Sequence, residues 1–212
     1  MSPKRRKTTF AISRRLRNLI FTLGVLLAFL LIALDHSPLR PGWHHYRQSA
    51  EQSQAFDFEK YHAKTFTVVK VVDGDTVDID VPDGRYNHTR IRLWGVDTPE
   101  TKKPDTPVAY FGPEASEFTT KLTLAKPVTD YLDKTNTRDK YSRLLAYIQL
   151  PDGNYLNELL LSEGYAYADF RFRHSFYNKY KQLESAARSN KKGLWEKVTP
   201  DKMPDWRQEK RF

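Results

Sequence analysis

The sequence has 212 residues, of which 39% are hydrophobic, contains no cysteine and carries a formal net charge of +9. This length suffices for one globular domain with appendages, and the lack of cysteine excludes disulfides, cysteine-ligated metal centres and a thiolate nucleophile. Seven of the cations lie within residues 1–18, so only +2 remains for the rest of the chain. The overall charge therefore gives little support to a basic nucleic-acid surface on the globular part.

The first 34 residues have the pattern of an export signal. The basic segment 1–18 precedes an uncharged apolar run, residues 19–34, and no A-x-A pattern follows. We interpret the run as a transmembrane or signal-anchor helix, with a cleaved signal as the alternative. Because only Arg40 and Arg47 follow closely, the positive-inside rule predicts a single-pass protein with a cytoplasmic N-terminus and an extracytoplasmic domain, or a secreted one after cleavage.

The next segment, residues 35–60, contains Pro38 and Pro41 and has no clean hydrophobic period, which predicts a linker. Neither internal repeats nor low-complexity stretches occur in the chain. We therefore expect one domain over residues 64–198 and a C-terminal tail over residues 199–212.

The start of this domain has the period of β-strands. Residues 65–72 and 76–81 alternate between apolar and polar side chains, and a third strand is predicted at 88–94. Asp73-Gly74 and Asp83-Gly84 are turn pairs of the hairpin type and separate the three strands. The pattern predicts an antiparallel meander.

The remainder of the domain mixes helices and strands. A helix is predicted after Pro113, and Gly164 closes the next one. The further elements are strands at 128–132 and 143–150 and helices at 155–163 and 176–190. Five short strands with three α-helices predict an α+β fold built on a closed barrel, with the five-stranded OB-fold the leading candidate.

Acidic residues gather in Asp73–Asp80, where glycine and glutamate are missing from the positions that an EF-hand requires. Asp78 and Asp80 are interpreted as a solvated strand face. Asp75 would instead share a face with Val77 and point inward, and an inward carboxylate needs a cationic partner or a metal.

Two further segments carry charged residues where strands meet loops. Arg92, Asp97 and Glu100 lie within nine residues around a strand end, and Arg143 begins a later strand after a polar turn. Guanidinium groups bind phosphate oxygens bidentately, carboxylates hold hard cations, and a glutamate can deprotonate water. Together these residues suggest a phosphate site.

Several motifs in a fixed order make the sequence recognisable. They are D-G-D-T, R-L-x-x-V-D-T-P-E, G-P-E-A-S, D-K-Y-x-R, L-A-Y-I and K-K-G-L-W. The chain resembles the staphylococcal nuclease (thermonuclease) family over about residues 64–198, here with an N-terminal membrane anchor. The combination is far more specific than any single motif.

The resemblance implies roles for individual residues. Calcium would be held by Asp75, Asp97 and the main-chain carbonyl of Thr98. Arg92 and Arg143 would be catalytic, with Glu100 as general base. The residues implied to contact the nucleotide are Lys140, Tyr141, Phe170 and Phe172. The two phenylalanines replace the family's tyrosines, and Ser142 stands where the family often has glycine.

We therefore expect a calcium-dependent, membrane-tethered and monomeric nuclease. It would hydrolyse phosphodiester bonds of DNA or RNA, with little sequence specificity and mainly in single-stranded regions. One alternative is a catalytically inactive OB-fold module that binds nucleic acid or protein. Another is an envelope scaffold that displays residues 201–212.

Overall fold

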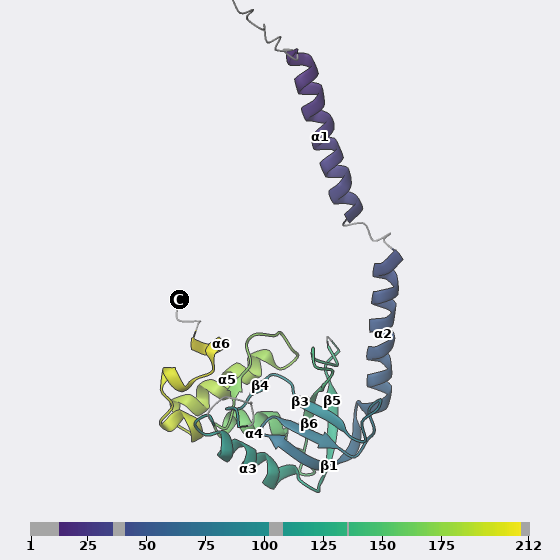
Figure 1. Cartoon of the computed structure of the whole chain (residues 1–212). Helices are drawn as coiled ribbons and strands as arrows, with labels where there is room; N and C mark the ends of the chain where they lie inside the picture. The colour runs from purple at the N-terminus through teal and green to yellow at the C-terminus, as the bar shows by residue number, and fades with distance from the viewer. Residues whose placement is uncertain (1–12, 36–40, 102–107, 135, 209–212) are drawn as a thin grey trace, which may run out of the picture. The chain divides into compact units, whose positions relative to one another are not determined.

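The structure is a computed structural model that describes residues 13–35, 41–101, 108–134 and 136–208 (Figure 1). It divides into two compact units, Met1–Gln52 and Ser53–Phe212. The second unit contains the barrel and every predicted site residue.

The first unit contains helix α1 (Arg14–Asp35), which covers the predicted apolar run. Large apolar side chains on it are exposed, among them Phe21, Leu26 and Phe29. No helix in the described parts of the chain is long and apolar enough to cross a membrane, so the predicted span over residues 19–34 is not supported. Much of the basic segment 1–18 lies outside the described residues.

The predicted linker over residues 35–60 is largely helical, because α2 runs from Pro41 to Tyr61. Its C-terminal turns belong to the second unit, where Tyr61 is fully buried and Asp57 is 1% exposed. Asp57 accepts hydrogen bonds from Thr137 and Arg138, about 80 residues later in the chain. These hydrogen bonds are tertiary contacts, and the helix has no continuous apolar stripe. The periodicity of the sequence therefore did not reveal α2.

The predicted barrel is confirmed, with a closed strand order β1-β2-β3-β6-β5 (Figure 1). Neighbouring strands are antiparallel except β3 and β6, which are parallel. Two irregularities bend β1, so its first half pairs with β5 and its second half with β2. The strands are β1 (Lys64–Asp73), β2 (Thr76–Ile79), β3 (Thr89–Leu93), β5 (Pro127–Leu132) and β6 (Leu144–Gln149).

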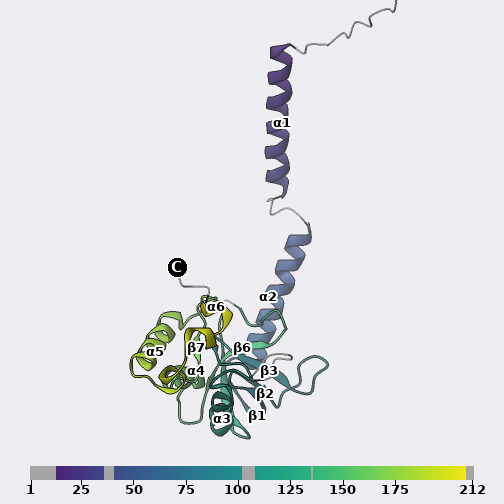
Figure 2. The ribbon, with the colours of Figure 1, turned by 60° about the vertical axis from the view of Figure 1, so that its left-hand side comes forward.

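Three helices pack against the barrel where the sequence predicted them. They are α3 (Gly112–Thr123), α4 (Leu156–Ser162) and α5 (Tyr177–Ser189). Helix α3 packs on β1, while α4 contacts β6 and α5 (Figure 2). Gly164 ends α4 with a φ of +76°, and a Cβ there would meet the Lys192 carbonyl oxygen at 2.2 Å, so only glycine fits.

A second, two-stranded sheet and a folded C-terminal segment were not predicted. β4 (Val96–Asp97) pairs with β7 (Tyr167–Ala168) and so fixes the backbone of Asp97. The predicted tail contains helical turns η2 (Pro200–Lys202) and α6 (Asp205–Gln208), which follow η1 (Gly193–Glu196). Side chains of α6 reach the candidate site, as described below.

One strand prediction was wrong about burial. Asp78 was interpreted as part of a solvated face, but it is 5% exposed. Arg90 is its direct partner across β2 and β3 and donates hydrogen bonds of 2.7 and 2.9 Å to its two carboxylate oxygens. The alternation of residues along one strand does not reveal an ion pair with a neighbouring strand. Asp80, in contrast, is exposed as expected.

Asp130 on β5 gives a testable prediction about stability. The residue is fully buried and, within the described parts of the chain, no group donates a hydrogen bond to its carboxylate. Burial raises its pKa well above the ordinary value, so its protonated form folds best and stability is lost as pH rises through the folded pKa. We expect Asp130→Val to raise the free energy of unfolding at pH 7.5 by about 1–3 kcal/mol.

Urea denaturation at pH 7.5 and pH 4 measures this effect. The gain should shrink at pH 4, near the pKa of an aspartate in an unfolded chain, about 3.9. Asp130→Asn is the matched control, since it removes the charge but leaves a polar group buried, and it should gain less. Equal stability of wild type and Asp130→Val at pH 7.5 would contradict the assignment.

Candidate active site

The turn between β1 and β2 places Asp75 inside the molecule, as predicted. Asp75 is 5% exposed, and its Oδ2 accepts hydrogen bonds from the backbone N–H and the hydroxyl of Thr98, at 2.8 and 3.0 Å. Gly74 allows this approach, because a Cβ at that position would lie 2.8 Å from the Thr98 side chain. Thr119 of α3 donates to the Gly74 carbonyl at 2.6 Å, which holds the turn against the helix.

Arg92 lies between two carboxylates near the end of β3. Its Nη1 is 2.5 Å from Asp75 Oδ2, and its Nη2 donates to Asp97 Oδ1 at 2.6 Å. Pairing of β3 with both β2 and β6 fixes the Arg92 backbone. One guanidinium thus connects the β1–β2 turn, β3 and β4.

Negative charge is concentrated around this guanidinium. Burial, reinforced by the neighbouring Asp75, raises the pKa of Asp73 to about 7. Burial also raises the pKa of Asp97, although Arg92 acts in the opposite direction. Burial by itself would lower the pKa of Arg92, but Asp75 and Asp97 outweigh it and the net shift is upward. The arginine therefore stays charged, and the aspartates around it outnumber it.

The loop before β6 carries Arg143, and Asp139 organises that loop. One Asp139 oxygen accepts the backbone N–H groups of Tyr141 and Arg143, and the other accepts Arg143 Nε at 2.7 Å. Ser142 between them has a φ of +63°, the left-handed region that favours glycine. The side chain of Arg143 is 29% exposed, so a ligand can reach it.

Nine of the ten predicted site residues line one cavity of about 590 Å³, a size typical of small-ligand sites. The exception is Phe170, whose ring packs 5.5 Å from that of Tyr177 instead. Asp169 accepts the backbone N–H of Arg171, and this turn breaks the strand alternation that would have put Phe170 beside Phe172. Phe172 does line the cavity and lies 5.7 Å from Trp94.

Sequence reasoning missed several residues around this cavity. Arg171 lines it and forms an ion pair with Asp169 at 2.8 Å. Trp206 of α6 donates from Nε1 to Asp97 Oδ2 at 2.9 Å, and the Arg171 guanidinium lies 4.6 Å from its ring centre. Asp73 could have been recognised within the D-G-D turn, but nothing in the aperiodic C-terminal segment indicated Trp206.

The donor set of this site suits a hard divalent cation. Asp75 and Asp97 converge on one guanidinium, and carboxylate oxygens are the ligands that calcium prefers. No group of three acidic, histidine or cysteine side chains placed to hold an ion occurs among the described residues. Beyond the two aspartates, a cation would need uncharged oxygen ligands, and the expected main-chain carbonyl of Thr98 is of this kind.

Comparison with protein families matches residues 90–197 to the staphylococcal nuclease homologue family. The chain belongs to this family. It is 42% identical over 134 residues to the thermonuclease of Staphylococcus hyicus, which covers 62% of this chain and 76% of the relative. The thermonuclease of Staphylococcus intermedius is 40% identical over 135 residues, covering 63% and 77%. Endonuclease YncB of Bacillus subtilis is 35% identical over 133 residues, covering 62% and 61%.

The matched range includes some residues of the candidate site and leaves others out. Arg92, Asp97, Glu100 and Arg143 lie inside the matched range, whereas Asp75 and Trp206 lie outside it. Asp75 is nevertheless tied to the matched part through Arg92 and Thr98. Trp206 lies beyond the C-terminal end of the matched range and contacts the same aspartate as Arg92.

Ser142 provides a second prediction. Ser142 is in the left-handed conformation, which costs a residue with a side chain about 1–2 kcal/mol of folding stability. Glycine avoids this cost, but it loses more backbone entropy on folding, which offsets part of the gain. We expect Ser142→Gly to raise the free energy of unfolding by about 1 kcal/mol. Urea denaturation measures the change, and Ser142→Ala, which keeps the Cβ, should match wild type. A glycine variant less stable than wild type would show that the turn is not strained.

Proposed function

We propose that this protein is a calcium-dependent nuclease that hydrolyses phosphodiester bonds of DNA or RNA. The observation that carries the proposal is the convergence of two aspartates, two arginines and a glutamate on one cavity: Asp75, Asp97, Arg92, Arg143 and Glu100. Names of relatives support it, because they include thermonuclease and endonuclease. An inactive binding module would have no need of this charged set.

The two arginines would bind and stabilise the phosphate. Each now contacts carboxylates, Arg92 those of Asp75 and Asp97 and Arg143 that of Asp139, so each is held at the cavity wall before substrate arrives. A phosphorane carries more negative charge than the phosphodiester, and guanidinium forks match its oxygens. Such contacts stabilise the transition state more than the bound substrate, so their loss should affect kcat more than KM.

Glu100 would be the general base that takes a proton from the attacking water. It lines the same cavity, and its Oε1 accepts the backbone N–H of Thr101 at 3.0 Å, which orients the carboxylate. The residues proposed to hold calcium are Asp75, Asp97 and the carbonyl of Thr98. Bound calcium would supply charge stabilisation to the scissile phosphate.

The substrate would be an extended, single-stranded region of nucleic acid. Lys140, Tyr141 and Phe172 line the cavity beside the charged set, and Tyr141 and Phe172 are more than half exposed. Exposed rings next to cations are suited to stacking on bases of any type, which favours little sequence specificity.

Digestion of a single-stranded oligonucleotide by the full chain tests this function. Cleavage should require calcium and stop with a chelator. Arg143→Ala should lower kcat by about 10²–10³, and Glu100→Gln by about 10²–10⁴. In both variants KM should change less than kcat.

Lys181→Ala is the matched control, since it removes an exposed cation on α5 that does not line the cavity. It should cleave like wild type. Equal cleavage with calcium and with chelator would refute the metal requirement. A wild-type chain that binds single strands without cutting them would identify the inactive binding module instead.

We also propose that the N-terminal segment tethers the nuclease to a membrane, with the domain outside the cytoplasm. Support comes from the uncharged run over residues 19–34, the seven cations before it, and the exposed apolar side chains of α1. Cell fractionation and the mass of the mature protein test this proposal. Full-length protein in the membrane fraction is expected, whereas a product shortened at its N-terminus and found in the medium would identify a cleaved signal.

A further inference from the structure

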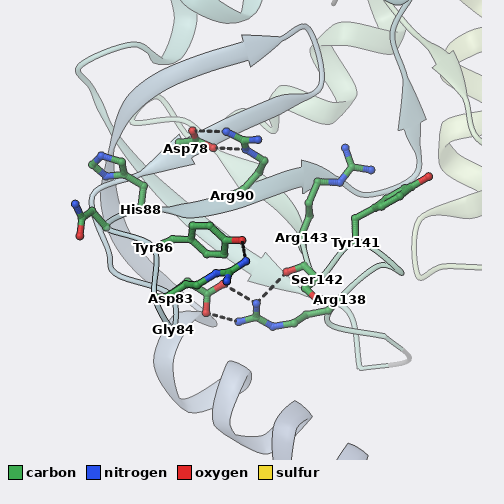
Figure 3. A pocket seen from close by; sticks show the side chains of 12 residues that line it. Asp78, Asp83, Gly84, Tyr86, His88, Arg90, Arg138, Tyr141, Ser142 and Arg143 are labelled. Atoms are coloured by element: carbon green, nitrogen blue, oxygen red, sulfur yellow. Dashed lines mark hydrogen bonds and ion pairs between the residues drawn. The ribbon is translucent and has the colours of Figure 1, made fainter. Parts of the chain in front are cut away.

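A second cavity, of about 660 Å³, adjoins the candidate active site. The two cavities share Tyr141 and Arg143, and Figure 3 shows these two side chains next to each other at the edge of the second cavity. Its other wall is the connection between β2 and β3, residues 83–88, with Asp78 and Arg90 from the strands themselves. We call this second cavity the β2–β3 groove. A chain bound at Arg143 in the active site can therefore continue directly into it.

Ion pairs fix the walls of the β2–β3 groove. Arg138 contacts the buried Asp57 at 2.7 Å. It also contacts Asp83 at 2.6 Å and donates to the Ser142 carbonyl at 3.0 Å (Figure 3). The second pair, Arg90 with Asp78, was described above. These ion pairs connect the segments that line the groove and so stabilise its walls.

The connection itself is a tight hairpin that presents Tyr86. Asp83 and Tyr86 exchange two backbone hydrogen bonds of 2.9 and 3.0 Å, and Gly84 between them has a φ of +58°. The turn is therefore closed by backbone bonds and glycine, without help from the Tyr86 ring. That ring is 60% exposed and lies in the groove (Figure 3).

Arg85 supplies the positive charge that the groove offers to a ligand. Its Nη2 donates to the Tyr86 hydroxyl at 3.0 Å, and its guanidinium lies 5.1 Å from the ring centre. No carboxylate in the described residues forms an ion pair with it. Across the groove, Tyr141 is 68% exposed and has Lys140 and Arg143 at 4.9 and 5.5 Å from its ring centre. Both sides thus combine an exposed aromatic ring with a cation.

We propose that the β2–β3 groove binds the single strand of nucleic acid that flanks the scissile phosphate. A base would stack on Tyr86 and an adjacent backbone phosphate would contact Arg85. Alternating rings and cations are the chemistry by which proteins follow a single strand without reading its sequence. The proposal rests on the proposed nuclease function, since it assumes that the strand passes Arg143.

Binding is tested with the full chain and a fluorescein-labelled oligothymidylate of 12 nucleotides, in the presence of chelator so that no cleavage is expected. Fluorescence anisotropy should show Tyr86→Ala binding at least about fivefold more weakly than wild type. Tyr86→Phe keeps the ring and should bind within about twofold. Arg85→Ala should weaken binding and lower the slope of log affinity against log salt concentration by about one. Lys181→Ala should change neither.

A second measurement separates this proposal from the proposed function. Cleavage of a dinucleotide with one phosphodiester, in calcium, should have the same kcat/KM in Tyr86→Ala, Arg85→Ala and wild type, because this substrate is too short to need the groove. Oligonucleotide binding within about twofold of wild type in both variants would overturn the groove assignment, as would a parallel loss of dinucleotide cleavage. A wild-type chain that cleaves neither substrate would refute the nuclease, while the anisotropy series would still decide whether the groove binds single strands.

Discussion

The ion contacts of Arg92 with Asp75 and Asp97 are the constraint on which the rest of the site depends. They connect three segments that are separate in the sequence: the β1–β2 turn, β3 and the small β4–β7 sheet. The Arg92 side chain is only 13% exposed, so water screens its charge poorly. Loss of either aspartate would leave the buried guanidinium with one carboxylate in place of two, and breaking a buried ion pair costs more than breaking one at the surface. The cluster therefore forms as one unit.

A second arginine organises the neighbouring β2–β3 groove in the same way. Arg138 connects the end of α2, the β2–β3 hairpin and the loop that carries Arg143. Asp139 then fixes the direction of Arg143 within that loop. As a result, the wall shared by the active-site cavity and the β2–β3 groove is held from both sides. A ligand that crosses from one cavity to the other meets side chains that are already positioned.

The C-terminal segment adds another layer to the site. Trp206 donates to the carboxylate that Arg92 also holds, and Arg207 next to it forms an ion pair with the buried Glu184 of α5. Glu184 in turn accepts the backbone N–H of Ala168 on β7, the strand that pairs with β4. The C-terminal segment thus holds the Asp97 side chain directly, through Trp206, and holds the Asp97 backbone indirectly, through Glu184 and β7.

Much of this protein follows from local sequence pattern. Alternation and turn pairs located all five barrel strands, and glycine and proline located the ends of the main helices. The ordered motifs, through the family that they resemble, indicated ten site residues, and nine of these line the cavity. These features are decided by neighbours in the chain, which a single sequence displays. What only the tertiary structure decided depends on residues far apart in the sequence. Three contacts are of this kind: Asp78 with Arg90, Asp57 of α2 with Arg138, and Trp206 with Asp97. None of them produces a periodic pattern or a fixed spacing in the sequence. An ion pair or a hydrogen bond needs only one partner, and the folded chain decides where that partner lies.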